Sequence, residues 1–266
     1  MDGPHAGRLV AINPLMRCGA CPACTSGAEH LCASRELMGM RVPGAFAESV
    51  AIDTANLTLL PEGVNLADIA LAEPLACALH TIYLARAALS SPLSDQRMVI
   101  LGGGAIGLLT ALAAHYYDCT NILMAETNDT RRKVLEQVTT AATYNPLQAV
   151  PDAAENCDIL IDAVGSGLTR KAASALVRPG GVIVHIGLQD NLDGLDTRRL
   201  TLQEITFQGS YCYTDADFQL AVDLLVNQTI TGTGWTELRA LKDGPQAFID
   251  IDEGRAGPKI ILNTDL

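Results

Sequence analysis

Four cysteines stand close together near the start of the chain, spaced C-x2-C-x2-C-x7-C: Cys18, Cys21, Cys24 and Cys32. Thiolates bind Zn²⁺ well, and four of them on a short, glycine-containing loop can close a tetrahedral shell around one ion. Such a shell leaves no coordination position for a substrate. The spacing therefore predicts a structural zinc site rather than a catalytic one.

Three other uses of these cysteines compete with zinc. Two disulfides would need an oxidising compartment, but no signal peptide is recognisable, and we expect a cytoplasmic protein, in which disulfides are rare. A ferredoxin-type iron–sulfur run also begins C-x2-C-x2-C. It continues C-x3-C-P, however, whereas here the fourth cysteine is eight positions on and Ala33 follows it. Buried free thiols remain as a third alternative, which the tight clustering disfavours.

A glycine-rich turn follows the apolar run at residues 98–101 and precedes a helical pattern. In a G-x-G-x-x-G motif the first glycine permits the tight turn, the second lets a pyrophosphate approach the backbone, and the third allows close helix–strand packing. The N-terminus of the following helix offers free N–H groups to the phosphates. The motif supplies the candidate coenzyme contacts Gly102, Gly104, Ala105, Ile106 and Gly107.

An acidic residue, Glu126, closes the next predicted strand, about twenty residues past the glycines, where a carboxylate can bind the ribose hydroxyls of NAD. The same carboxylate repels the 2′-phosphate of NADP. Arg131 and Arg132 could serve that phosphate instead, but they lie on the following helix. The sequence therefore favours NAD, with a solvated acid at a strand end as the alternative interpretation of Glu126.

These motifs need a scaffold, and from residue 98 onward short apolar strands alternate with helical patterns. We expect strands at 98–101, 121–125, 141–144, 158–164, 182–187 and 205–211, and helices at 108–117, 130–138, 169–177 and 216–227. Near-continuous apolar strands separated by helices predict a parallel sheet covered on both faces, the doubly wound α/β (Rossmann) arrangement. Between the third and fourth strands the link is short, so we expect little or no helix there.

The first part of the chain has a different rhythm. We expect strands at 8–13, 44–52 and 56–60, followed by a helix that Asn65 caps and that runs through Glu73 toward Leu89. Pro74 inside that pattern predicts a kink or a break. We interpret the cysteines and histidines inside the predicted elements as core residues rather than ligands: Cys77, His80, Cys119, Cys157 and His185.

Composition limits the classes of partner. The chain has 266 residues, of which 18% are charged, with a formal net charge of −12. No basic patch is available to bind nucleic acid or an anionic membrane surface, and charged residues interrupt the longest apolar stretch. We therefore expect a soluble globular protein.

The cysteine loop, the segment AEPLACALHT, the turn GGGAIG and the segment RPGGVIVHIGL occur in the order typical of zinc-dependent medium-chain dehydrogenases. The chain most resembles their polyol branch, which includes sorbitol, L-idonate and galactitol-phosphate dehydrogenases. This resemblance implies a partial GroES-like catalytic domain at 1–72 with the structural zinc, a Rossmann NAD-binding domain at 73–226, and a C-terminal return to the catalytic domain at 227–266. It also implies a homo-oligomer, either a dimer or a tetramer.

The resemblance assigns roles to individual residues. Glu73 corresponds to a glutamate near the catalytic zinc, and Glu126 and Arg131 to the ribose and adenosine contacts. The nicotinamide would lie against the strand ends at Val164, Gly165, Gly187 and Leu188. The implied reaction is oxidation of a secondary alcohol, a polyol or sugar alcohol, by NAD.

The chain departs from the family where the catalytic zinc is concerned. The family takes a cysteine and a histidine from segments well before the structural-zinc loop, whereas here no cysteine precedes Cys18 and His5 is the sole upstream histidine. Cys212 also replaces an arginine that sorbitol dehydrogenases carry. Two hypotheses follow: a dehydrogenase whose N-terminal part is absent from this chain and whose turnover is impaired, or a non-catalytic NAD-binding and assembly module.

Overall fold

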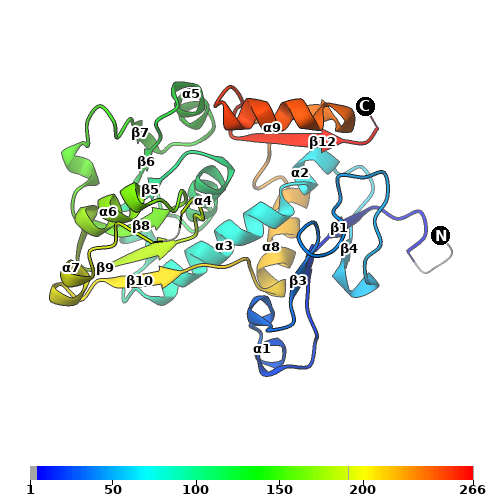
Figure 1. Cartoon of the computed structure of the whole chain (residues 1–266), viewed down its shortest axis with the longest axis horizontal. Helices are drawn as coiled ribbons and strands as arrows, with labels where there is room; N and C mark the ends of the chain where they lie inside the picture. Colours follow the sequence, from blue (N-terminus) through cyan, green and yellow to red (C-terminus); the bar gives the residue numbers. More distant parts are fainter. Residues whose placement is uncertain (1–4, 191, 266) are drawn as a thin grey trace.

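The computed structural model describes residues 5–190 and 192–265, and a six-stranded parallel sheet dominates it (Figure 1). The strand order is β10-β9-β8-β5-β6-β7, with every neighbouring pair parallel. The strands are β5 (Met98–Leu101), β6 (Ile122–Ala125), β7 (Ala142–Tyr144), β8 (Cys157–Asp162), β9 (Val177–His185) and β10 (Thr206–Gly209). The order reverses between β5 and β8, so the carboxyl ends of these two strands flank the switch point where such sheets bind ligands.

Helices cover both faces of the sheet, because successive side chains in its apolar strands point to opposite sides. In β5, Met98 and Ile100 join the core under α3 (Ala72–Ala87), α4 (Ala105–Tyr116), α5 (Asp129–Val138) and α8 (Asp215–Val226). Val99 and Leu101 join the core under α6 (Gly167–Leu176), to which the segment after α7 (Thr197–Leu202) contributes Ile205. This arrangement confirms the predicted doubly wound fold.

Polar residues begin several of these helices. Ser166 and Thr169 form a reciprocal capping box at α6, and Thr214 and Asp217 form another at α8. Each box satisfies backbone N–H groups that a helix start leaves without partners. Asn128 caps α5 through the N–H of Arg131. The caps fix where the helices start, and thus the shapes of the loops at the carboxyl ends of the strands.

The N-terminal part consists of small antiparallel pairs and the cysteine loop. β1 (Val10–Ile12) pairs with β4 (Leu57–Leu59), and β2 (Leu15–Met16) pairs with β3 (Glu36–Leu37). The cysteine loop holds α1 (Pro22–Thr25) and a 3₁₀ turn at Glu29–Leu31. A second 3₁₀ turn, Thr54–Asn56, precedes β4, and α2 (Leu66–Ile69) precedes α3.

The C-terminal part adds a separate pair of strands. β11 (Thr236–Ala240) lies parallel to β12 (Lys259–Asn263), with α9 (Gly244–Asp252) between them in sequence. Further 3₁₀ turns occupy Leu93–Asp95, Asp152–Ala154 and Leu241–Asp243. The turn at Asp152–Ala154 is the only helical piece between β7 and β8 in the described chain, as the short link predicted.

Two sequence expectations are corrected. The described residues 44–52 form no strand, since none of the sheets in the described part of the chain offers them a pairing partner. The helix after Asn65 is broken as expected, but at 70–71 rather than at Pro74. Pro74 lies in the first turn of α3, where its missing N–H costs no helical hydrogen bond.

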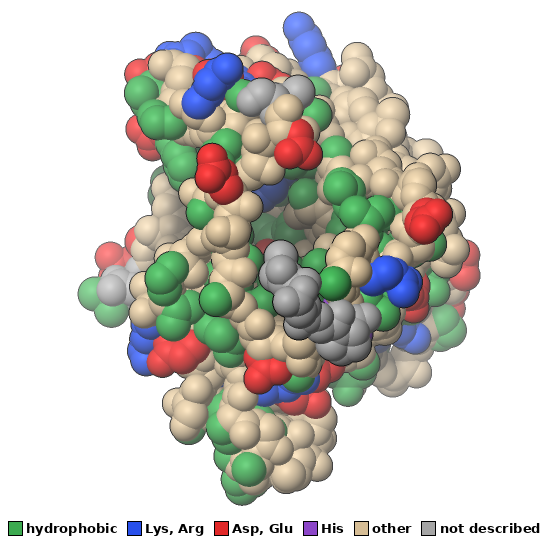
Figure 2. Space-filling view, turned by 90° about the vertical axis from the view of Figure 1, so that its right-hand side faces the viewer, with side chains coloured by type: hydrophobic (Ala, Val, Ile, Leu, Met, Phe, Trp, Pro, Cys, Tyr) green, Lys and Arg blue, Asp and Glu red, His purple; other side chains and the backbone are tan. Residues whose placement is uncertain are grey.

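The side of the molecule that carries β1 and β4 is hollowed. Figure 2 looks at this side and shows hydrophobic side chains around a central depression. Phe46 and Phe248 meet edge to face, with ring centroids 5.9 Å apart, although both side chains are exposed. No helix in the described residues has the length and apolarity that crossing a membrane requires.

Candidate functional site

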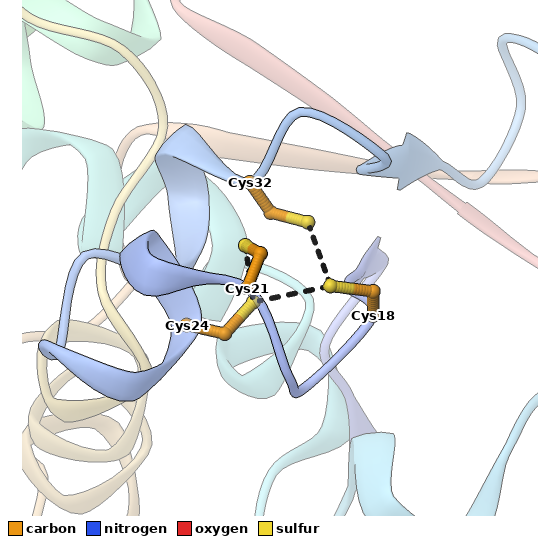
Figure 3. A group of neighbouring side chains, drawn as sticks. All are labelled: Cys18, Cys21, Cys24 and Cys32. Carbon is orange, nitrogen blue, oxygen red and sulfur yellow. Dashed lines mark hydrogen bonds between the residues drawn. The ribbon is translucent and has the colours of Figure 1, made fainter.

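The four predicted zinc ligands converge in the cysteine loop (Figure 3). The Sγ atoms of Cys18, Cys21, Cys24 and Cys32 all lie within 4.8 Å of one another. Individual Sγ–Sγ distances are 3.5 Å for Cys21–Cys24, 3.5 Å for Cys18–Cys32 and 3.9 Å for Cys18–Cys24. Zinc–sulfur bonds of about 2.3 Å in a tetrahedron place sulfurs roughly 3.8 Å apart. The donor set therefore fits one zinc ion, and the sulfurs are too far apart for disulfide bonds.

The backbone of the loop also favours the thiolate form of Cys18. Hydrogen bonding from the backbone of Ala20 and Cys21 lowers the pKa of the Cys18 thiol to about 6. A thiolate is the form that binds a metal. Among the described residues this is the one group of three or more cysteine, histidine or carboxylate side chains placed to share an ion.

The cysteine loop packs against α3, α8 and the segment that precedes α8. The ring of His30 meets that of His80 on α3, with centroids 4.6 Å apart. Arg17 pairs with Asp215 at the start of α8, and the Arg35 guanidinium lies 4.6 Å from the centroid of the Tyr211 ring. A zinc in the loop would thus stabilise the contacts that hold the N-terminal part against the sheet domain.

The glycine turn has the geometry that its motif predicts. Gly102 has φ +100°, in the region that favours glycine. A Cβ on Gly107 would lie 1.9 Å from the carbonyl oxygen of Gly102, so the helix can approach the strand only without a side chain there. A Cβ on Gly104 would meet nothing within 4 Å. Gly104 is the N-cap of α4 and no side chain caps this helix, so the first amides, including those of Ala105 and Ile106, have no acceptor from an N-cap side chain.

Glu126 lies directly after β6 and ties the second strand to the glycine turn. Its carboxylate accepts hydrogen bonds from the N–H of Gly103 at 2.7 Å and of Asn128 at 2.8 Å. Arg131 Nη1 lies 3.8 Å from Glu126 Oε2, whereas Arg132 donates to the Glu126 carbonyl oxygen and pairs with Asp129. The structure thus brings Glu126, Arg131 and the turn together, and gives Arg132 a local structural role.

The strand ends expected to line the nicotinamide also meet. Val164 and Gly165 follow β8, and Gly187 and Leu188 follow β9. A Cβ on Gly165 would lie 2.1 Å from the carbonyl carbon of Gly187, so the two loops touch through their backbones. Beneath them the fully buried Asp162 accepts from the N–H of Gly165 at 2.8 Å.

The sequence interpretation missed the polar network behind these loops. His185 was assigned to the core, but its Nδ1 lies 3.0 Å from Asp162 Oδ2 and the side chain is half-buried. Arg170 is almost completely buried and reaches both loops. The sequence offers one signal for this network: the apolar strand β8 ends on a charged residue, Asp162. Nothing in the helical pattern marked Arg170.

Glu73 lies in the first turn of α3 and borders a cavity of about 680 Å³. The other lining residues are Pro14, Leu37, Met38, Gly39, Gly44, Ala45 and Phe46. Burial raises the pKa of the Glu73 carboxyl above its usual value. Cys77 Sγ lies 3.5 Å from Glu73 Oε1. This pair offers two donors, fewer than the three protein ligands that catalytic zinc sites have.

Comparisons with known proteins agree with this geometry. Residues 105–227 match the model of the family described as zinc-binding dehydrogenase, and residues 1–62 match that of the alcohol dehydrogenase GroES-like domain. The 2-dehydro-3-deoxy-L-galactonate 5-dehydrogenase of Pseudoalteromonas atlantica is 29% identical over 270 residues, covering 98% of this chain and 77% of that protein. D-xylulose reductase A of Aspergillus oryzae is 25% identical over 278 residues, covering 98% and 75%.

Solved structures show the same fold. The crystal structure of L-idonate 5-dehydrogenase from Escherichia coli superposes with a TM-score of 0.87 at 25% identity, covering 96% of this chain and 75% of that one. Galactitol-1-phosphate dehydrogenase from the same organism gives 0.85 at 22% identity, covering 98% and 79%. With its cysteine shell, glycine turn and two matched domains, the chain belongs to the zinc-dependent medium-chain alcohol dehydrogenase family.

Proposed function

We propose that this protein binds NAD across the carboxyl edge of its sheet and serves the transfer of hydride from a secondary alcohol, a polyol or sugar alcohol, to NAD. The observation that carries the proposal is the open space over Gly104, bounded by the uncapped start of α4 and by Glu126. The pyrophosphate would lie on the helix start and the adenosine ribose on Glu126. The sugar-acid and sugar dehydrogenases among the relatives support the substrate class.

The described residues do not by themselves fit a catalytic zinc. Such an ion, when bound, acts as a Lewis acid toward the alcohol oxygen. Glu73 and Cys77 are the pair closest to the expected position, and no third ligand joins them in the described part of the chain. We therefore route no step through that ion. The role we give this chain is to hold the coenzyme and the structural zinc, with Glu73 in the wall of the substrate cavity.

This ligand count favours a second candidate function, a non-catalytic NAD-binding and assembly module. We expect the 266-residue chain to show NADH binding but little or no turnover. The measurement is NAD reduction with a panel of polyols and sugar alcohols at saturating Zn²⁺. Robust zinc-dependent turnover would contradict the incomplete metal site. It would also rule out the non-catalytic module and show that this chain alone acts as a dehydrogenase.

Coenzyme choice gives a direct test of Glu126. We expect Glu126→Ala to lower the affinity for NAD relative to NADP, because the variant loses two acceptors for the ribose hydroxyls and the charge that repels a 2′-phosphate. The expected change in the NAD/NADP affinity ratio is about tenfold, the size of one or two charge-assisted hydrogen bonds.

The control is Glu136→Ala, on the exposed side of α5, where the carboxylate contacts only Thr143 among hydrogen-bond partners in the described residues. Both variants are titrated with each reduced coenzyme by fluorescence. An unchanged ratio in Glu126→Ala would remove the ribose role from this residue.

Three further features belong to the same proposal. We assign residues 1–72 to the GroES-like part, 73–226 to the coenzyme domain and 227–266 to a return toward the GroES-like part. The exposed apolar side chains Phe46 and Phe248 favour self-association, consistent with a homo-oligomer. Reduced thiols at the zinc site favour a cytoplasmic location.

A further inference from the structure

The proposed NAD site leaves one half of the coenzyme to be placed, and this inference rests on that proposal. With the pyrophosphate at the β5–α4 turn and the adenosine ribose at Glu126 after β6, the nicotinamide half must extend to the other side of β5. The sheet order places β8 and then β9 on that side. The described parts of the loops that follow these two strands, at 163–166 and at 186–190 and 192–196, therefore form the floor for the nicotinamide.

These two loops depend on each other for their positions. A Cβ on Gly187 would lie 2.1 Å from the carbonyl carbon of Val164, and a Cβ on Gly165 would clash equally with Gly187. Because the contact is between backbones, any shift of the loop after β9 changes the surface that a nicotinamide ring would meet.

Apolar packing holds the start of the loop after β9 but not its middle. Ile186 packs against the core, whereas Leu188 and Leu192 are 87% and 84% exposed. The middle of the loop therefore keeps its conformation mainly through polar contacts. Two of these are backbone hydrogen bonds to the loop after β8, from the N–H of Gln189 to the carbonyl oxygen of Val164 and from the N–H of Asp190 to that of Gly165.

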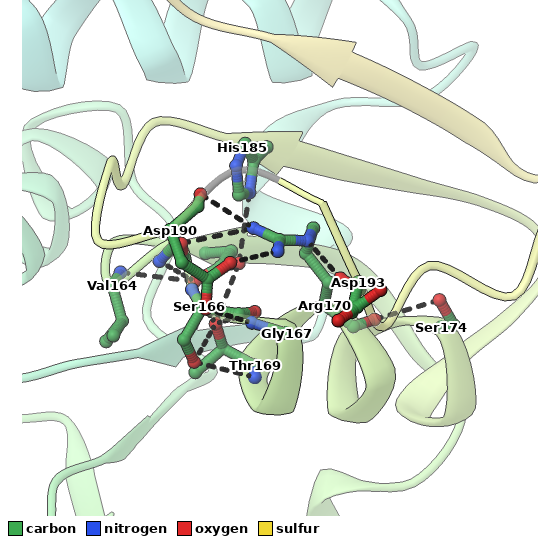
Figure 4. Close-up of polar contacts among 11 residues, drawn as sticks. Val164, Ser166, Gly167, Thr169, Arg170, Ser174, His185, Asp190 and Asp193 are labelled. Atoms are coloured by element: carbon green, nitrogen blue, oxygen red, sulfur yellow. Dashed lines mark hydrogen bonds and ion pairs between the residues drawn. The ribbon is translucent and has the colours of Figure 1, made fainter.

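Arg170 adds a side-chain bridge to these backbone contacts (Figure 4). It lies on α6, is only 6% exposed, and directs its guanidinium between the two loops. Toward the loop after β9, Nε donates to the carbonyl oxygen of Asp193 at 2.6 Å, Nη1 to that of Asp190 at 3.3 Å, and Nη2 pairs with the Asp190 carboxylate. Toward the loop after β8, Nη1 donates to the carbonyl oxygen of Gly165 at 3.1 Å.

Asp162 cannot replace this bridge. Its carboxylate accepts from the N–H groups of Val164 and Gly165 in the loop after β8, from the Thr169 hydroxyl on α6 and from His185 in β9 itself. It therefore fixes the first loop but forms none of the hydrogen bonds of Asp190 and Asp193. Asp190 completes the bridge, since its other carboxylate oxygen accepts from the N–H of Gly167 at 2.9 Å.

We propose that Arg170, with Asp190 as its partner, is a positioning residue that sets the affinity of this protein for the nicotinamide half of NAD. A planar guanidinium can satisfy acceptors in two loops at once, which a lysine ammonium cannot do in the same geometry. The adenosine half contacts neither loop, so its binding is independent of Arg170.

The test compares two ligands on the full chain. NADH is titrated by fluorescence and ADP-ribose, which lacks the nicotinamide, by calorimetry. We expect Arg170→Met to weaken NADH binding by about tenfold, the loss of a charged hydrogen-bond set, and to leave ADP-ribose within about twofold. Asp190→Asn, at a half-exposed carboxylate, should shift the same ratio in the same direction and keeps the test decisive if Arg170→Met does not fold.

Arg178→Met is the matched control. Arg178 pairs with Asp158, with Nε and Oδ1 2.6 Å apart. Both residues lie at the amino ends of β9 and β8, away from the proposed coenzyme site at the carboxyl ends, so the loss of Arg178 should change neither affinity. An unchanged NADH/ADP-ribose ratio in both Arg170→Met and Asp190→Asn would overturn the positioning role. Equal weakening of both ligands would also overturn it. If the unmodified chain bound neither ligand, the proposed NAD site itself would be wrong.

Discussion

Gly104→Val is expected to weaken NADH binding strongly while leaving the stability of the fold unchanged. The backbone of Gly104, with φ −73° and ψ −171°, suits any residue, and a Cβ there meets nothing within 4 Å. The added methyl groups would instead fill the space in front of the α4 amides. We expect the affinity to fall by about 100-fold, equivalent to roughly 2.8 kcal/mol, with a smaller loss in Gly104→Ala.

Gly107→Ala provides the contrast within the same motif. Its Cβ would lie 1.9 Å from the Gly102 carbonyl oxygen, so the strand and the helix must separate. We expect destabilisation of about 3 kcal/mol, or roughly 6–12 °C in Tm, in addition to weaker coenzyme binding. Thermal unfolding and NADH titration distinguish the two variants. NADH binding by Gly104→Val with the affinity of the unmodified chain would show that the pyrophosphate lies elsewhere.

Cys32→Ala is expected to produce the second large effect, through the loss of zinc. Helix α1 of the cysteine loop buries none of its side chains, so apolar packing contributes little to the fold of this loop. The metal must supply most of the stabilisation. Structural zinc contributes about 10–16 kcal/mol in small zinc domains, and we expect about 5 kcal/mol here, or roughly 10–20 °C in Tm.

Cys157→Ala is the control for that substitution, because Cys157 is as completely buried as Cys32 but lies in β8, outside the cysteine loop. It should cost only about 1 kcal/mol and leave zinc binding intact. Thermal unfolding of both variants, with and without a chelator, gives the comparison. If Cys32→Ala unfolded at the same temperature as the unmodified chain, the loop would not depend on a metal.

The parts of the site that the sequence predicts are those in which the geometry is local. The cysteine spacing and the glycine turn each occupy one short segment, so residue type and separation determine what they can do. The sequence predicts the apolar strands equally well, since a short fully apolar run such as MVIL at β5 is typical of a buried parallel strand. Their order in the sheet follows from the general rules of doubly wound folds.

The errors arise where the outcome depends on distant partners. The alternating pattern at 44–52 suits a strand, but a strand needs a neighbour to pair with. Pro74 is tolerated in α3 because the helix begins two residues earlier, which no local pattern specifies. The sequence does not mark Arg170, because its burial depends on contacts with Asp190 and Asp193, twenty or more residues further along the chain. The helical pattern alone gives an arginine the appearance of a surface residue.

Zinc per chain, measured by elemental mass spectrometry on protein purified without added metal, tests the central claim most directly. The claim is that the described residues form one closed cysteine shell and no second metal site. The structure predicts about one zinc per chain. A value near zero would contradict the cysteine shell. A value near two would show that the chain holds a second metal site, and would contradict the incomplete site on which the low expected turnover depends.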